Sequence, residues 1–289
     1  MSKPFRFFLL VLYGVGLGLF VGVLWKALPY YRLDLIERPH SLAHPDFKPG
    51  GRIGHALGIL GSAMLLLLFL YSARKRELFG LRWGNISRWL DIHIFFGIMG
   101  PLYITLHTSL KFNGIVSISY FAMVAVMLSG FFGRYIYMQI PRDEEGHVLS
   151  LQMALEREKQ LERELRNNFG LSDEVLQQIF MRFPERSGQL QLGLWEMIWL
   201  DIVRPFRTHR LKKIIHKEAP ELSGRAFSIV ISTIKQRNLL MRRRAFSRTA
   251  HKIFHYWHVI HKPFAVVMIV FMFIHIVVTL MFGYGLQFR

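Results

Sequence analysis

The chain has 289 residues, of which 52% are hydrophobic and 14% aromatic, and it carries a formal net charge of +18 and no cysteine. Its long apolar blocks exclude an ordinary soluble domain and place it in the membrane class. Without cysteine there can be no disulfides, thiolate-ligated iron–sulfur clusters, covalently attached haem or cysteine nucleophiles. Any metal must therefore be held by histidine or carboxylate.

Five segments are apolar over about the 20 residues that a bilayer requires. They are 5–25, 54–73, 90–110, 115–139 and 256–283. The first is similar to a signal peptide, but no small-residue cleavage site follows it, so we expect a retained helix. The predicted fold class is all-α: a polytopic membrane bundle of about five transmembrane helices, with a mostly helical cytoplasmic insertion between the fourth and the fifth.

Basic residues indicate the orientation of the bundle. Lys3 and Arg6 precede the first span, and five basic residues fill the loop between the second and third spans, at positions 74, 75, 76, 82 and 88. Because basic loops stay inside, we expect a multi-pass protein of a cytoplasmic-type (inner) membrane with its N-terminus inside. The loop 26–53 would then face outward, and beyond Lys26 it also holds Arg32, Arg38, Lys48 and Arg52, so the asymmetry is modest.

This topology predicts three regions: 1–140 with four spans, 141–250 as a basic amphipathic cytoplasmic domain, and 251–289 with the last span. In the cytoplasmic domain, Leu151, Leu155, Leu161 and Leu165 alternate with charges, which is typical of a solvated or partner-facing amphipathic helix. Ser172 and Asp173 are candidate caps of a second helix.

The later part of the insertion is strongly basic. From Met197 to Ala250 there are thirteen Lys or Arg residues against three acids. Trp195 lies just before this stretch and Trp199 lies at its start. A basic segment bearing aromatic residues next to membrane spans favours contact with the anionic inner leaflet. A positive-inside signal with no specific partner is the alternative. Nucleic acid is not an expected partner, because no recognition motif accompanies the charge.

Four histidines stand at matched positions in the third and fifth spans. His93 and His107 are fourteen residues apart, and so are His261 and His275. At 100° per residue this spacing leaves both members of a pair within about 40° of one helix face and about 21 Å apart along the axis. Both spans run from inside to outside in the predicted topology, so His93 can face His261 near the cytoplasmic side and His107 can face His275 toward the outside.

Two imidazoles from facing helices are the axial ligands that a six-coordinate haem iron needs, and ligation would satisfy side chains that hydrocarbon otherwise penalises. The alternative is that the four histidines hydrogen-bond to backbone or to one another without metal. With these positions, the chain resembles the di-haem membrane cytochromes b, a class that includes cytochrome b of the bc complexes and the membrane domains of ferric reductases and NADPH oxidases. The resemblance implies two non-covalent b-type haems, with His93, His107, His261 and His275 as iron ligands.

The chain also departs from those families. No dinucleotide-binding fingerprint is present, whereas ferric reductases and NADPH oxidases continue into flavin and nicotinamide domains. The insertion between the two ligand-bearing helices is long for a compact bundle. The gamma subunit of nitrate reductase is similar in its five helices and in delivering electrons from quinol, but its histidine ligands are spaced differently.

Other residues are candidates for contact with the cofactors. Gly97 and Gly130 could let a flat macrocycle approach the backbone, although close helix packing is the commoner use of such glycines. Arg52 and Arg134 could pair with haem propionates or simply snorkel to the interface. His258 competes with His261 as the inner ligand, and His55 is a candidate for a third haem, a proton path or a structural role.

The leading hypothesis is an electron-transfer component that links a cytoplasmic or quinol donor to an acceptor on the other side. Its expected partners are the lipid bilayer, a quinone, and a soluble or membrane redox protein that docks on the cytoplasmic domain or the outer face. One rival is a self-sufficient oxidoreductase that reduces a metal ion, superoxide or quinone at the outer haem. The other is a haem-free scaffold or transporter. The sequence gives no catalytic residue of its own.

Overall fold

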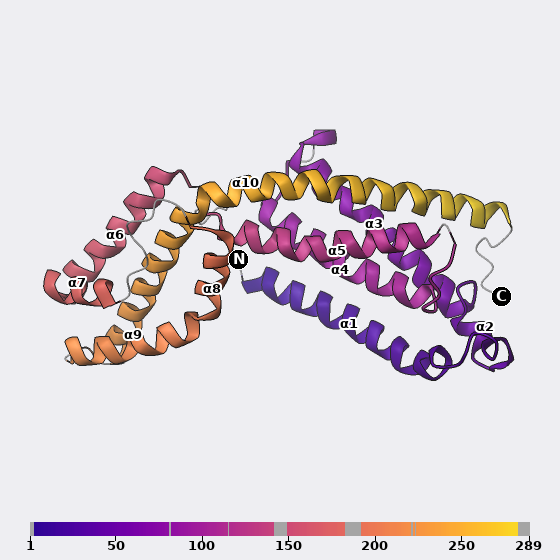
Figure 1. The fold of residues 1–289 in the computed structure, drawn as a ribbon, viewed down its shortest axis with the longest axis horizontal. Helices are drawn as coiled ribbons and strands as arrows, with labels where there is room; N and C mark the ends of the chain where they lie inside the picture. The colour runs from indigo at the N-terminus through magenta and orange to yellow at the C-terminus, as the bar shows by residue number, and fades with distance from the viewer. Residues whose placement is uncertain are drawn as a thin grey trace. The chain divides into compact units, whose positions relative to one another are not determined.

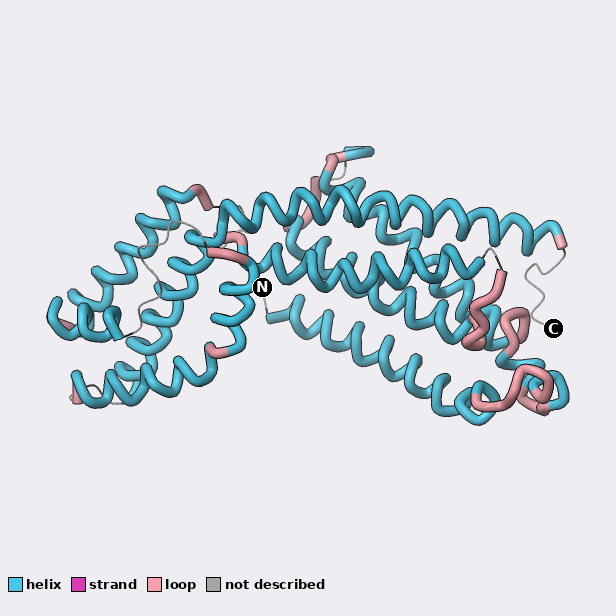
Figure 2. The backbone as a smooth tube through the Cα atoms, viewed as in Figure 1, coloured by secondary structure: helices cyan, strands magenta, loops and turns pink. Residues whose placement is uncertain are grey.

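A computed structural model describes residues 3–80, 82–114, 116–141, 149–182, 192–220, 222 and 224–282. Within these ranges all regular structure is helical (Figure 2). The chain divides into two compact units: unit 1 comprises Met1–Phe132 and His258–Arg289, and unit 2 comprises Gly133–Trp257.

The helices follow one another along the chain as labelled in Figure 1. They are α1 (Lys3–Tyr31), the short η1 (Arg38–His40) and α2 (His44–Phe47), α3 (Arg52–Lys75), the short η2 (Leu78–Gly80), α4 (Ile86–His107), α5 (Val116–Gln139), α6 (Leu151–Phe169), α7 (Asp173–Arg182), α8 (Leu194–Ile202), α9 (Arg204–Glu218) and α10 (Gly224–Met281).

Among the described residues, five helices are long and apolar enough to cross a membrane, namely α1, α3, α4, α5 and α10. This confirms the predicted all-helical fold class and the predicted number of candidate spans. One boundary differs from the prediction. The last span is the C-terminal part of α10, a single helix of 58 residues that begins far inside the predicted cytoplasmic region.

Unit 1 is built on the close pairing of α3 and α4, which glycines permit. A Cβ atom on Gly61 would lie 3.1 Å from the carbonyl oxygen of Gly100, so the two backbones approach where side chains are missing. The other face of α4 packs on α1 through Phe95, Met99 and Tyr103, all of them buried. The face of α4 that bears His93 and His107 is therefore directed toward α3 and α10.

A buried arginine fixes one end of unit 1. Arg38 is 5% exposed, and its guanidinium donates to the carbonyl oxygens of Leu33 (3.1 Å), Tyr31 (2.7 Å) and Ser109 (2.7 Å). Tyr31 ends α1 and Ser109 follows α4, so the cation meets carbonyls that no further helical turn satisfies. The C-terminal ends of α1 and α4 therefore lie together, which makes these helices parallel.

The basic segments of unit 1 lie at its opposite end. The guanidinium of Arg88, at the start of α4, lies 5.3 Å from the centre of the Phe5 ring near the start of α1. The basic residues around the N-terminus and those of the α3–α4 loop thus share one end of the bundle, as the prediction of sidedness requires.

Unit 2 contains α6 to α9, the N-terminal part of α10 and the last residues of α5. Its largest core joins apolar residues of α6, α7, α9 and α10, among them Leu165, Ile179, Ile215 and Ile234. A second core forms where α5, α8 and α10 meet, around Ile136, Met197 and Phe246.

The cap predicted at Ser172 is confirmed, because its hydroxyl accepts from the backbone N–H of Val175 (3.3 Å). The predicted leucine stripe of α6 is correct only in part: Leu161 and Leu165 are buried, whereas Leu151 and Leu155 are 42% and 36% exposed.

A charged network completes the inner face of α6. Glu158 is 5% exposed and pairs with Arg237 (3.5 Å) and Arg244 (3.2 Å) of α10, and Glu162 pairs with Arg237 (2.6 Å). Because these carboxylates are paired within the unit, α6 packs as a core helix of unit 2 on this face.

Candidate cofactor-binding site

The four histidines lie on inward stripes of α4 and α10 within unit 1. On α10, His261 and His275 share a face with Met268 and Met272, which are 3% and 6% exposed, whereas Val266 on the other face is 61% exposed. The apolar outer face is suited to lipid. The inward face turns its two imidazoles toward the neighbouring helices.

The outer pair, His107 and His275, is brought together across α4 and α10. Their ring centres lie 6.4 Å apart, with an angle of 61° between the ring planes. A metal bound by two imidazoles, each at about 2 Å, holds the two ligating nitrogens about 4 Å apart. The ring centres are then farther apart than the nitrogens, because each nitrogen lies on the rim of its ring. The observed separation therefore leaves room for one iron between the two rings.

A backbone contact sets the orientation of His107. Its Nδ1 lies 2.8 Å from the carbonyl oxygen of Gly54 on α3. Because a carbonyl oxygen can only accept, Nδ1 carries the proton and Nε2 carries the free lone pair. This tautomer and second contact are those of a histidine that ligates a metal through Nε2.

A glycine of α3 makes room for this imidazole. A Cβ atom built on Gly58 would lie 2.7 Å from Nδ1 and 2.8 Å from Cε1 of His107. The absence of a side chain at position 58 therefore lets His107 lie flat against α3.

His93 and His261, the predicted inner pair, lie on the same two helices, each fourteen residues before His107 and His275. His93 Nδ1 lies 3.2 Å from the carbonyl oxygen of Leu68, and its ring centre is 5.1 Å from that of Tyr71. This contact again places the proton on Nδ1 and leaves Nε2 as the donor to a metal.

A serine of α5 orients His261. The hydroxyl of Ser129 donates to the carbonyl oxygen of Val126 (2.9 Å), and its oxygen lies 2.6 Å from Nδ1 of His261. Since the hydroxyl proton is used toward Val126, the serine oxygen accepts from Nδ1–H of His261. Groups of two helices, α3 and α5, thus hold three of the four histidines in the same tautomer.

Apolar side chains fill the space between the two pairs. Met268 and Met272 of α10 pack with Leu65 of α3 and with Ala122 and Met123 of α5, all of them buried. The hydroxyl of Ser119 donates to the carbonyl oxygen of Met268 (2.9 Å), which ties α5 to α10 at this level. The two histidine pairs are therefore separated by a layer of buried apolar side chains.

The predicted arginines have other contacts. Arg52 forms an ion pair with Asp46 (2.7 Å), and its side chain is 66% exposed. Arg134 belongs to unit 2, where its guanidinium lies 5.8 Å from the centre of the Tyr137 ring. Pairing of either arginine with a propionate stays a prediction.

Among the predicted glycines, a Cβ atom on Gly130 would meet nothing within 4 Å, and one on Gly97 would meet only Leu68, at 3.8 Å. The backbone is thus uncovered at both positions. His55 lies within electrostatic range of His107, and His258 within range of His261, so each is a neighbour of a predicted pair.

Within the described ranges, no group of three or more His, Asp or Glu side chains is placed to hold a metal ion. His107 and His275 form a pair of imidazoles across α4 and α10.

Sequence reasoning missed Ser129 and the carbonyl groups of Gly54 and Leu68. A carbonyl acceptor carries no sequence signal. A serine in a span is a hydrogen-bonding candidate, but its partner depends on the rotation of two helices.

Comparison of the chain with protein-family models, curated proteins and solved structures finds no match in any of the three.

Proposed function

We propose that this protein is a membrane di-haem b-type cytochrome that carries electrons across the bilayer. The observation that carries the proposal is the pairing of His107 with His275 across α4 and α10, with His93 and His261 fourteen residues before them on the same two helices. The hydrogen bonds at Nδ1 of His93, His107 and His261 support it, because they leave Nε2 of each ring for iron.

Each residue has a defined part in this proposal. The four imidazoles would hold two haem irons, Gly58 admits the His107 ring, and Ser129 orients His261. A bound b-type haem supplies one-electron redox chemistry. The buried methionines and leucine between the pairs make an apolar surrounding of low dielectric constant, which would influence the potentials of bound haems.

The spacing of the pairs suits transfer across a membrane. Fourteen residues of helix correspond to about 21 Å, against about 30 Å for the hydrocarbon core. Each pair would then lie about 4–5 Å inside one surface of the core, within reach of a donor on one side and an acceptor on the other. We propose a cytoplasmic or quinol donor, an acceptor on the opposite side, and a redox partner that docks on unit 2 or on the outer face.

Haem stoichiometry tests the proposal. The full chain, purified in detergent, is expected to show a reduced-minus-oxidised b-type spectrum and two haems per chain by the pyridine haemochrome assay. His107→Ala and His261→Ala should each lower the content toward one. His209→Ala is the matched control, since this histidine is exposed on α9 of unit 2.

A chain without Soret absorbance would refute the proposal and favour a haem-free scaffold or transporter. An unchanged haem content in both ligand variants would assign the haem to other residues.

A further inference from the structure

Helix α8 of unit 2 has an exposed apolar stripe that continues into the first turn of α9. Trp195, Trp199 and Ile202 follow one another at intervals of four and three residues, so they share one helix face. They are 80%, 63% and 60% exposed, and Phe206 of α9 is 73% exposed. These four residues form the outward stripe. Large apolar side chains that are exposed together mark an interaction surface.

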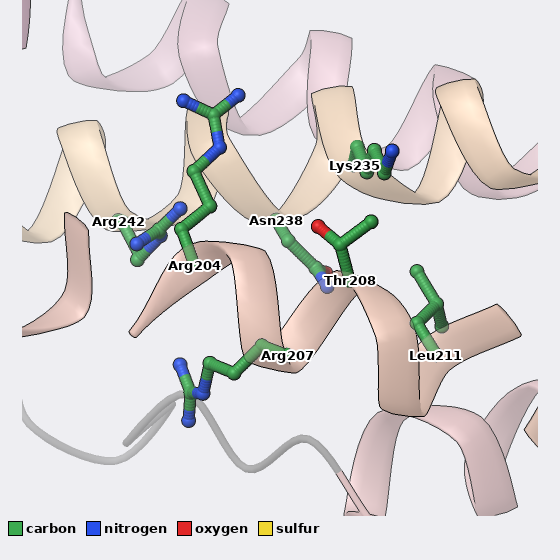
Figure 3. A pocket seen from close by; sticks show the side chains of 7 residues that line it. All are labelled: Arg204, Arg207, Thr208, Leu211, Lys235, Asn238 and Arg242. Atoms are coloured by element: carbon green, nitrogen blue, oxygen red, sulfur yellow. The ribbon is translucent and has the colours of Figure 1, made fainter. Parts of the chain in front are cut away.

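The opposite faces of both helices are packed within unit 2. Met197 is fully buried in a core that includes Ile136 of α5 and Phe246 of α10. On α9, Thr208 and Leu211 lie on the side turned to α10, where they line a small cavity (Figure 3). Both helices are thus held by one face, which leaves the outward stripe on the other.

The two acids of α8 are used for contacts within unit 2. Glu196 Oε2 accepts from the backbone N–H of Gly193 at the start of the helix (3.0 Å). The carboxylate of Asp201 accepts from the hydroxyl of Tyr135 and the side-chain amide of Gln139, both at 3.0 Å. Because α8 is apolar on its packed face and on its exposed face, it is suited to apolar surroundings on two sides.

The contacts of Asp201 also place α8 at one end of a candidate span. Tyr135 and Gln139 lie in the last two turns of α5, a helix that is long and apolar enough to cross a membrane. The last turns of a span lie near the boundary between hydrocarbon and headgroups. Tryptophan is enriched at this boundary, because its ring is apolar and its N–H needs a polar partner.

Basic residues continue the outward stripe along α9. Arg210 and Lys213 follow Phe206 by four and seven residues, so the three share a helix face, and both cations are exposed. A second copy of the chain laid on this face would bring these cations together. The headgroups of anionic phospholipids attract them instead. The charge therefore favours a lipid surface over a second copy.

We infer that α8 is an interfacial helix whose outward stripe lies in the headgroup region of the membrane. Its aromatic side chains, rather than the basic part of the insertion, make the apolar contact with lipid. None of the four paired histidines takes part, so this contact does not depend on haem.

Fluorescence quenching tests this contact in the full chain, placed in nanodiscs that contain phosphatidylglycerol. Because the chain has no cysteine, Ile202→Cys and Phe206→Cys each give a single labelling site. Gln177→Cys, at an exposed position of α7, is the matched control. Phospholipid that is brominated near the headgroup end of its acyl chains quenches a label in contact with lipid, whereas acrylamide quenches a label in water.

We expect strong bromolipid quenching and weak acrylamide quenching at positions 202 and 206, and the reverse at position 177. Trp195→Ser with Trp199→Ser should remove most of the bromolipid quenching at position 202. Trp83→Ser, which removes a 68% exposed tryptophan from the α3–α4 loop, should leave it unchanged.

Strong acrylamide quenching at all three positions would mean that water surrounds the outward stripe. Weak quenching by both reagents at positions 202 and 206 would mean that protein covers it, from a second copy or from another chain. Either result overturns the inference.

Discussion

Replacing Gly58 by alanine should damage the outer histidine pair selectively. The new Cβ atom would lie 2.7 Å from Nδ1 of His107, whereas ordinary contact begins at 3.4 Å, so the ring must retreat by about 0.7 Å. That shift weakens the 2.8 Å contact with Gly54 and changes the 6.4 Å separation of the ring centres of His107 and His275. Overpacking of this kind costs about 1–3 kcal/mol, which corresponds to about a 5- to 150-fold lower affinity for the outer haem.

The assay is haem titration of the purified Gly58→Ala chain, followed by a redox titration that resolves the two haems. We expect the outer haem to be lost or shifted in potential and the inner one to stay unchanged. Alanine has the higher helix propensity, so a loss cannot come from the α3 backbone itself. Gly18→Ala is the control, because a Cβ atom there meets nothing within 4 Å. Equal haem content and equal potentials in both variants would refute the reasoning.

Three further predictions concern other parts of the chain. Ser129→Ala removes the acceptor of the Nδ1–H of His261, which makes this imidazole less basic. In a redox titration, one haem potential should rise by about 20–60 mV and the other should stay unchanged. Arg38→Met leaves buried carbonyls without their donor and should destabilise the protein by about 2–4 kcal/mol in detergent unfolding, whereas exposed Arg32→Met should be nearly neutral. Because the chain has no cysteine, Trp199→Cys gives a single site for a fluorophore on α8, where the Trp199 side chain is 63% exposed. Its emission should shift to the blue in anionic nanodiscs, whereas the emission of the same fluorophore on exposed Lys159→Cys of α6 should not. Equal spectra would contradict a lipid-facing α8.

Much of the fold could be predicted because membrane spans are coded by local composition. Length and apolarity identified all five candidate helices, and the equal spacing of the histidines on two of them drew attention to α4 and α10. Length, apolarity and spacing can be read directly along the sequence, so they do not depend on how the helices are rotated or packed.

The sequence did not predict that α10 is one continuous helix, because its composition changes at a place where the helical backbone does not end. The shift from basic to apolar residues near position 256 marks a change of surroundings, yet no proline stands between Gly224 and Pro263 to end the helix. A change of hydropathy alone does not break a helix.

The burial of Glu158 on the inner face of α6 could not be predicted from the sequence. Glu158 replaces an apolar residue in the stripe and is buried only because Arg237 and Arg244 of α10 neutralise it. A carboxylate that long-range partners make tolerable looks in the sequence like a solvent-facing one.

The second contacts of the histidines depend on tertiary register. Ser129 reaches His261 across 132 positions of sequence, and Gly54 reaches His107 across 53. Such pairings follow from how α3, α5 and α10 are rotated about their own axes, which apolar composition does not specify.

Electron transfer through the intact bilayer tests the account most directly. Proteoliposomes containing the full chain are loaded with ferricyanide, and dithionite is added outside. We expect rapid reduction of the trapped acceptor with the wild-type chain, and a rate near that of protein-free vesicles with His275→Ala. Reduction at the same slow rate with wild-type chain and with empty vesicles, or no effect of the His275 substitution, would contradict a transmembrane path through the paired histidines.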